Sequence, residues 1–459
     1  MKKQKILYTI LALLLPFSMV LAQEQLSLRD QAAASFQRFE YARSAEIYSQ
    51  LAERKDPRLQ DLERAGDSYY NMRDFTNAEN WYARVIQHED HQAIHALRYA
   101  DILKANGKYE SAKAQYQRYA ERSGRANAVA VQIAGCDSAL LWMANPTSHA
   151  LANEQAVNTT GSEFAVSMIA NVVHFAGEIA RENKSFDAIY AWTGRPFLKL
   201  HHASIQQDGS LGTPTLVGAE LNNPNYHVGP VASPDHGQTL YVTRTHVGKE
   251  VGLEKVKGTK YRTHRLEIYI YETQNGKWTA TPFEHNDPEN YSVGHATFSL
   301  DGQTVYFASD RPGGQGGTDI WYSTRKADGT WATPINAGNQ INTAGEELFP
   351  VIGADGSLYY STDGLAGMGG LDVFQSQGSK DAWEKPVNLG FPLNSSADDF
   401  SFVIVKDNEQ IQSGYLSSNR LGGKGEDDIY AFHFLKPESL SLNLNLNQSP
   451  NQLLSSCKN

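Results

Sequence analysis

The sequence predicts an N-terminal α-solenoid followed by a five-bladed β-propeller, a multidomain fold that is first α and then all-β. One observation behind this prediction is a 34-residue period in the first third of the chain. A second is a pattern of two strands, a glycine-rich loop and a third strand, which recurs five times in the rest. At 459 residues the chain is too long for one ordinary core, so more than one domain is expected.

The first 22 residues predict a secretory signal peptide (residues 1–22). Lys2, Lys3 and Lys5 precede an apolar run over residues 6–21, and small or compact residues precede Gln23, the expected mature N-terminus. A membrane anchor is the alternative, but a membrane span needs about 20 apolar residues. We therefore expect an exported, soluble protein.

Residues 23–145 predict a helical array with a 34-residue period. The residues that share one phase are Tyr41/Phe75/Tyr109, Ser44/Ala78/Ala112, Tyr48/Tyr82/Tyr116 and Ala32/Gly66/Ala100. Small residues at points of close helix approach, with aromatic residues between them, are typical of tetratricopeptide repeats. A terminal helix over residues 127–143 is expected to cover the apolar face of the last repeat.

The stretch over residues 294–321 shows the blade pattern most clearly. Apolar residues alternate up to a turn at Asp301-Gly302, and a second β-rich run ends in Ser309-Asp310-Arg311 before the glycine-rich loop. Alternation bounded by Asp-Gly and Gly-rich turns predicts antiparallel strands. Further copies cover residues 349–374, 400–430, 230–269 and, in the most degenerate form, 164–190 with its third strand expected at 187–190. Radial repetition of short sheets predicts a β-propeller.

A short phrase between the blades predicts how the ring closes. The phrase stands before an inner strand as Leu221-Asn222, Ile341-Asn342-Thr343 and Leu393-Asn394-Ser395, and it also stands as Val157-Asn158-Thr159, where no blade precedes it. Residues 151–158 are therefore expected to form the outer strand of the last blade, which removes that sheet's open edge. A six-bladed ring and closure by residues 440–446 are the alternatives.

The domain boundaries follow from these patterns. The propeller is assigned to residues 150–435, and residues 436–459 to a tail that is too short for another domain.

The combination of the two repeat types resembles a known family. The pattern Ser-Asp/Asn-Arg, a glycine-rich loop and Asp-Ile-aromatic stands at residues 309–321 and 418–430. The copy at 361–374 lacks the arginine and is read with one extra residue. Behind three tetratricopeptide-like repeats, this pattern resembles the periplasmic, outer-membrane-associated OmpA-family proteins of gliding and type IX-secreting bacteria, including PorE-like components. Its propeller resembles the WD-repeat-like, TolB-type class.

The resemblance carries expectations about location and partners. It covers about residues 23–434 and implies a periplasmic protein, associated with the outer membrane, whose partners are envelope proteins. Family members usually continue into an OmpA-like domain. The sequence given ends before such a domain, so peptidoglycan binding is not implied.

Charge and cysteine content bear on further partners. A formal net charge of −10 argues against nucleic acid, because binding to a phosphate backbone needs clustered Lys and Arg. Cys136 lies in an apolar helical stretch and Cys457 in the polar tail. A buried free thiol is expected for Cys136, and a disulfide between the two is the alternative.

No residue pattern indicates catalysis, a cofactor or a metal. The chain has no Gly-x-Ser-x-Gly elbow, phosphate loop or dinucleotide fingerprint. The histidines between residues 88 and 95 lack the spacing of a zinc helix, and the glycine-rich loops offer too few oxygens for calcium. Asp319, Asp372 and Asp428 are instead expected to accept hydrogen bonds from turn amides.

The concave face of the helical array is the surface best suited to binding. If the 34-residue repeats are aligned as above, this face is expected to carry Asp67, Tyr70, Asn71, Arg98, Asp101 and Lys104. The leading hypothesis is a non-enzymatic periplasmic scaffold, in which the array binds one partner and the propeller another. The alternative is a propeller enzyme, or a glycan- or peptide-binding module using the central funnel. Acids and aromatic residues in that funnel would favour this alternative.

Overall fold

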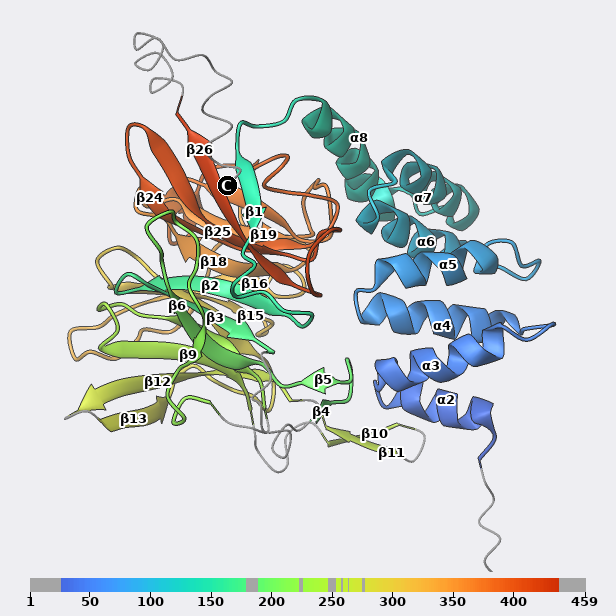
Figure 1. The fold of residues 1–459 in the computed structure, drawn as a ribbon, viewed down its shortest axis with the longest axis horizontal. Coiled ribbons are helices and arrows are strands. Elements are labelled where there is room, and N and C mark those ends of the chain that lie inside the picture. Colours follow the sequence, from blue (N-terminus) through green and yellow to red (C-terminus); the bar gives the residue numbers. More distant parts are fainter. Residues whose placement is uncertain are drawn as a thin grey trace, which may run out of the picture.

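The computed structural model describes residues 26–178, 189–222, 226–246, 253–256, 259–262, 264–274 and 277–436. The predicted signal peptide and Cys457 lie outside the described residues. Helices occupy the first part of the described chain and strands the rest, as Figure 1 shows. The α-then-all-β fold class is therefore confirmed.

The helical domain consists of antiparallel helix pairs followed by a terminal helix. The pairs are α2 (Leu28–Gln37) with α3 (Tyr41–Ala52), α4 (Leu59–Asn71) with α5 (Phe75–Val85), and α6 (Ala93–Ala105) with α7 (Tyr109–Ser123). The 3₁₀ turn η1 (Ala126–Val129) leads into α8 (Ala130–Ala144), which packs on α7 as the expected cover.

The 34-residue phase predicted from the sequence holds in the packing. Ser44, Ala78 and Ala112 are fully buried. Gly66 marks the tightest approach, because a Cβ there would lie 2.5 Å from the ring of Tyr82. The small residues therefore set the distance between paired helices.

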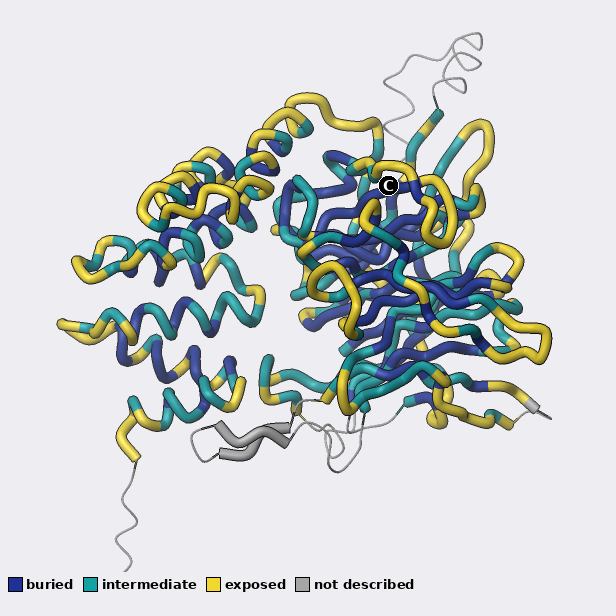
Figure 2. The backbone as a smooth tube through the Cα atoms, turned by 180° about the vertical axis from the view of Figure 1, so that it is seen from behind, coloured by how far each residue is buried: buried dark blue, intermediate teal, exposed yellow. Residues whose placement is uncertain are grey.

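The described strands form five four-stranded antiparallel sheets around a central axis (Figure 1). From inner to outer strand, the first blade consists of β2 (Glu163–Ile169), β3 (Val172–Gly177), β6 (Lys199–Ser204) and β7 (Thr215–Leu216), and the second of β8 (Val228–Ala232), β9 (Thr239–Thr245), β12 (Leu266–Gln274) and β13 (Lys277–Pro282). The third blade consists of β14 (Val293–Phe298), β15 (Thr304–Ser309), β16 (Asp319–Thr324) and β17 (Ile335–Asn336), and the fourth of β18 (Glu347–Ile352), β19 (Leu358–Thr362), β20 (Asp372–Ser376) and β23 (Val387–Asn388). The fifth blade consists of β24 (Asp399–Asp407), β25 (Ile411–Ser418), β26 (Asp428–Leu435) and β1 (Ala150–Asn153). Buried residues follow these strands and the inner faces of the helices in Figure 2.

In the part of the chain that the structure describes, three short hairpins lie outside the blades. They are β4 (Ile189–Tyr190) with β5 (Arg195–Pro196), β10 (Leu253–Val256) with β11 (Thr259–Arg262), and β21 (Gly378–Ser379) with β22 (Ala382–Trp383).

The ring closes through β1, the strand that follows the helical domain. It pairs antiparallel with β26, from Ala150 opposite His433 to Asn153 opposite Tyr430. This confirms the closure predicted from residues 151–158, although the paired strand is shorter and starts one residue earlier. The last blade thus combines strands from both ends of the propeller.

An asparagine from each inter-blade phrase holds the third strand of its own blade. Asn158 donates through Nδ2 to the Ile429 carbonyl (2.8 Å) and accepts through Oδ1 from the Ile429 N–H (2.9 Å). The same pair of bonds joins Asn222 to Leu200, Asn286 to Ile268, Asn342 to Ile320 and Asn394 to Val373. Sequence analysis missed Asn286, because the residues around it do not repeat the phrase.

Two sequence assignments in the blades are corrected. The third strand of the first blade is β6, paired with β3, and not residues 187–190. Of those residues, Ile189 and Tyr190 form the separate hairpin β4–β5, and 187–188 lie outside the described part of the chain. The fourth blade has no extra residue, because Thr362 pairs with Asp372 just as Ser309 pairs with Asp319.

Candidate functional site: the cleft between the helical array and the propeller

The predicted groove residues lie on the side of the array that faces the propeller. Tyr70, Asp101 and Lys104 line a cavity of about 230 Å³ that propeller residues complete. The Lys104 ammonium donates to the Gly369 carbonyl at 2.6 Å, and the Asn71 carbonyl accepts from the Trp192 indole at 3.0 Å. Much of the predicted groove is therefore in contact with the propeller of the same chain.

The two remaining groove residues mainly serve the array itself. Asp67 accepts a 2.5 Å hydrogen bond from the Tyr82 hydroxyl, and the Arg98 guanidinium lies 4.0 Å from the centre of the Tyr70 ring. Asp101 likewise accepts from the Tyr116 hydroxyl at 2.9 Å, and its burial raises its pKa to about 6. We infer that these polar groups fix the helix pairs in place.

One contact between the domains is made by Met368 on the loop before β20. Its side chain, 1% exposed, belongs to the apolar core of α6, α7 and α8. On α8, a Cβ at Gly135 would lie only 2.5 Å from the Gly367 carbonyl oxygen, so the loop approaches the helix closely because residue 135 is glycine. This contact is not predicted by the sequence patterns. Its only signal was a methionine where the matching loops carry Gln315 and Lys424.

Cys136 is part of the same interface core. It is a buried free cysteine, as predicted, and burial raises the pKa of its thiol to about 11.

The second contact between the domains is made by Trp192 in the β4–β5 hairpin. Its ring meets Tyr41 edge-on at 4.8 Å and stacks on Phe39 at 6.0 Å. Its carbonyl accepts from the Ala42 N–H at 3.2 Å. This contact holds the N-terminal helices, whereas Met368 holds the C-terminal ones.

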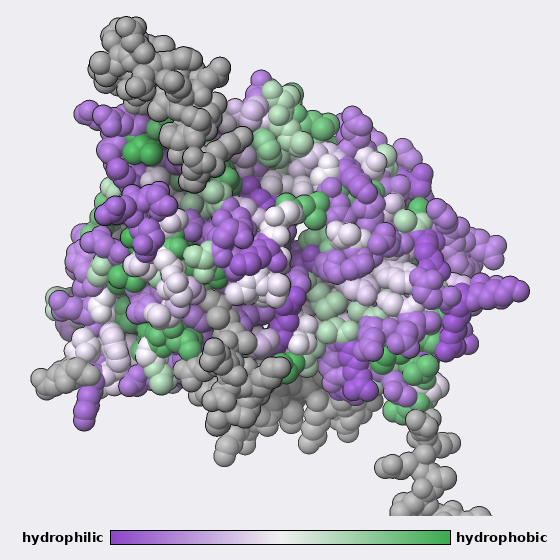
Figure 3. All heavy atoms as spheres, in the orientation of Figure 1, coloured by the Kyte–Doolittle hydropathy of each residue, from purple (hydrophilic) through white to green (hydrophobic). Residues whose placement is uncertain are grey.

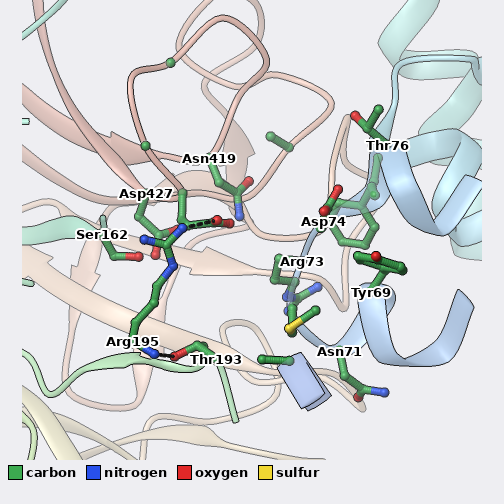
Figure 4. A pocket seen from close by; sticks show the side chains of 18 of the residues that line it. Tyr69, Asn71, Arg73, Asp74, Thr76, Ser162, Thr193, Arg195, Asn419 and Asp427 are labelled. Atoms are coloured by element: carbon green, nitrogen blue, oxygen red, sulfur yellow. Dashed lines mark hydrogen bonds and ion pairs between the residues drawn. The ribbon is translucent and has the colours of Figure 1, made fainter. Parts of the chain in front are cut away.

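Between these two contacts lies a cleft of about 870 Å³, shown in Figure 4. Its aromatic wall is formed by Tyr69 and Phe75 from the helices and by Tyr190 and Trp192 from the hairpin. The propeller contributes Ser162 and the loop at residues 419–427. Figure 3 shows the molecule hollowed between the two domains, with hydrophilic side chains along the helical side.

Arg195 and Arg73, which line the cleft, form ion pairs with nearby carboxylates. Arg195 lies 2.7 Å from Glu426 and 3.7 Å from Glu178. The Arg73 guanidinium lies 3.5 Å from Asp398.

The third arginine of the cleft, Arg420, supports the propeller loops. It contacts Asp399 at 2.5 Å and donates to the carbonyls of Pro392 and Leu393.

Two carboxyl groups at the cleft have strongly raised pKa values. Burial is the main reason that the pKa of Asp427 is raised to about 7, and the nearby Asp398 carboxylate contributes to the increase. The hydrogen bond from Ser162 has the opposite effect and lowers this pKa. Burial raises the pKa of Glu178 to about 7, although the Arg195 guanidinium opposes this. Burial is the main cause of both shifts, and neighbouring carboxylates add to it.

The acids of the glycine-rich loops act structurally, as predicted. Asp319 accepts from the Gln315 amide (2.5 Å), Asp372 from the Met368 amide (2.6 Å), and Asp428 from the amides of Lys424 and Gly425. Outer-strand asparagines also donate to these carboxylates, namely Asn336, Asn388 and Asn153. Among the described residues, no group of three or more His, Cys, Asp or Glu side chains could hold a metal ion.

The central channel of the propeller contains a cavity of about 320 Å³. Among the residues that the structure describes, no Asp, Glu, Lys or Arg lines it. His295 stacks on Phe349 with 4.0 Å between ring centres, and burial lowers its pKa to about 4, so it is uncharged at neutral pH. Of the acids and aromatic residues that would favour the funnel-based alternative, the described lining contains aromatic residues, Phe298, Phe349 and Tyr359, but no acid.

Comparisons with known proteins do not assign an activity. No protein-family model and no curated protein matches the chain. Among solved structures, a protein of unknown function from Dyadobacter fermentans shows 9% identity at a TM-score of 0.36, covering 63% of this chain and all of that one. An α-L-arabinofuranosidase from Lactobacillus brevis shows 10% identity at a TM-score of 0.34, covering 61% of this chain and 92% of the enzyme.

The chain spans only about half of another similar structure, a puromycin hydrolase. The identity is 10%, the TM-score is 0.32, and the match covers 57% of this chain and 51% of the hydrolase. At these values neither the activity nor the residues of any of these proteins transfer to this chain.

Within the described part of the chain, no helix has the length and apolar character needed to cross a membrane.

Proposed function

We propose that this protein is a non-enzymatic scaffold of the cell envelope that binds a partner protein in the cleft between its two domains. The observation that carries the proposal is the composite cleft itself. Contacts at Met368 and at Trp192 join the domains on either side of a cavity of about 870 Å³. This volume lies in the range of small-molecule pockets, so the cleft is large enough to receive side chains of a partner.

The use of the buried polar groups supports binding rather than catalysis. The loop acids accept backbone amides, the asparagines hold strands, and the described channel wall is uncharged. Location in the periplasm near the outer membrane, and a role with secretion or gliding components, are part of the proposal. They rest on the predicted signal peptide and on the family resemblance of the sequence.

Affinity purification from a detergent-solubilised envelope, followed by mass spectrometry, tests this function. Leu421→Arg alters the cleft, because Leu421 lines it and is 70% exposed. Leu300→Arg is the matched control, because Leu300 is 68% exposed at the channel cavity instead. Outer-membrane proteins should be recovered with the parent and with Leu300→Arg, and lost with Leu421→Arg. Equal recovery with both variants would contradict the assignment of the cleft.

A further inference from the structure

The cleft holds more negative than positive charge. The Arg195 guanidinium is shared between Glu178 and Glu426. The 8% exposed side chain of Glu178 keeps one oxygen, Oε2, without a hydrogen bond. One cation therefore serves two carboxylates on this side of the cleft.

The charge imbalance is repeated around Arg73. Its guanidinium pairs with Asp398, and Asp427 and Asp363 lie within its electrostatic reach. Asp427 forms no ion pair within 4.0 Å among the described residues; the polar side chain beside it is the Ser162 hydroxyl (Figure 4). A carboxylate next to other carboxylates gains most from a cation that enters from outside.

The hairpin that carries Arg195 also presents aromatic side chains to the cleft, which suit the stem of a long basic side chain. The rings of Tyr190 and Trp192 stack with an interplanar angle of 11° and a centroid distance of 6.4 Å, and both residues line the cleft, so they present aromatic surface to it. Lysine and arginine pack their methylene stems on such surfaces, and their charged ends interact with aromatic faces. On the helical side, Glu46 is exposed at the cleft and has no ion pair among the described residues.

We propose that the cleft binds a lysine or arginine side chain of an extended segment of a partner protein, with Asp427 as its counter-ion and Tyr190 and Trp192 as the surface for its stem. The inference rests on the proposed scaffold function and specifies the chemistry of its partner. The cleft volume exceeds that of one side chain, and Leu421 on its rim offers an apolar contact for a neighbouring residue of the segment. An acidic segment does not fit, because it would have to displace carboxylates that already pair with Arg73 and Arg195.

Isothermal titration calorimetry with short peptides tests the inference on the mature full chain. The probe is acetyl-Ala-Leu-Lys-Leu-Ala-amide. The comparators carry Nε-acetyl-lysine or glutamate at the central position. The lysine peptide should bind about tenfold more tightly than the acetyl-lysine peptide, and the glutamate peptide should bind least well. About tenfold corresponds to about 1.4 kcal/mol, a typical value for one favourable charged contact.

Asp427→Asn is the decisive variant at pH 8, where the Asp427 carboxyl group, with its pKa of about 7, is mostly ionised, because asparagine keeps the shape and removes the charge. It should weaken the lysine peptide about tenfold and leave the acetyl-lysine peptide unchanged. Asp56→Asn, on an exposed loop of the helical domain, is the matched control and should change neither affinity. A thermal melt confirms that Asp427→Asn is folded.

Three results would overturn the inference: no binding of the lysine peptide at millimolar concentration, tighter binding of the glutamate peptide, or unchanged lysine affinity in Asp427→Asn. Envelope proteins that are recovered by the parent and lost with Leu421→Arg would still support the scaffold function in that case. The two proposals can therefore fail separately.

Discussion

Replacing Asn158 with alanine tests the closure of the propeller ring. The Asn158 side chain is 2% exposed and holds both the N–H and the C=O of Ile429, which is itself buried. The substitution leaves the N–H without this acceptor and leaves the C=O with the Glu154 N–H, which donates to it at 3.0 Å. An unsatisfied buried N–H costs about 1–3 kcal/mol and the lost bond to the carbonyl about 0.5–1.5 kcal/mol more, so a loss of about 3 kcal/mol in the free energy of unfolding is expected.

Differential scanning calorimetry measures this loss. For a domain of this size, about 3 kcal/mol corresponds to a decrease of roughly 5–10 °C in the melting temperature of the propeller. Asn342→Ala removes the same two bonds within the third blade and should cost a similar amount. Asn290→Ala is the exposed control and should change stability by no more than about 0.5 kcal/mol.

Hydrogen exchange separates closure from general destabilisation. In Asn158→Ala the amides of β1 and β26 should exchange faster than those of the third blade, because the contact between the two ends of the ring is weakened. If Asn158→Ala melts like Asn290→Ala, the closing role of this asparagine is refuted. Uniformly faster exchange in all blades would also contradict it.

Three further predictions concern the domain interface and the cleft. Gly135→Ala should stabilise the isolated helix by about 1 kcal/mol. It should nevertheless weaken the docking of the domains, because the new Cβ would clash with the Gly367 carbonyl oxygen. Calorimetry should then resolve two unfolding transitions instead of one. The thiol of Cys136 should not react with a disulfide reagent at pH 8 until the protein unfolds, since burial raises its pKa to about 11; this is measured with the tail cysteine replaced by serine. Because the pKa of Asp427 is raised from 3.8 to about 7 in the folded state, the folded protein binds this proton more tightly, and stability is lost as the pH rises from about 4 to about 7. Asp427→Asn should therefore reduce the loss of stability between pH 5 and pH 8 by about 1–3 kcal/mol, measured by urea unfolding.

Each of these predictions has a result that contradicts it. A single, unshifted transition in Gly135→Ala would show that the loop moves without cost. Rapid labelling of the native thiol would show that Cys136 is accessible. Parallel pH–stability curves for the parent and Asp427→Asn would show that this carboxyl group titrates normally.

The repeats made much of the fold predictable from the sequence. The 34-residue phase located Ser44, Ala78 and Ala112, because a recurring close contact demands a small residue each time. The phrase around Asn158 predicted ring closure for a related reason: every blade needs the same pair of hydrogen bonds to its third strand.

Features that occur once were not predictable in the same way. The docking of the array depends on Met368 in one loop and Trp192 in one hairpin, and neither residue has a counterpart in other blades that would mark it. The third strand of the first blade was misplaced, because a chance match at residues 187–190 imitated the repeat while the pairing partner of β3 lay further along. The cleft itself arises from long-range packing of two domains, and no local pattern encodes it.

Site-specific photo-crosslinking in intact cells tests the central claim, that the cleft binds a partner protein in the cell envelope, most directly. A benzophenone amino acid replaces Leu421 at the cleft in one variant and Leu300 at the channel in the other, since the two side chains are similarly exposed. A crosslink is expected from position 421 to a discrete envelope protein, at a peptide that contains lysine or arginine, and no such crosslink from position 300. A crosslink from position 300 alone, or none from position 421 in cells that export the protein, would contradict this claim.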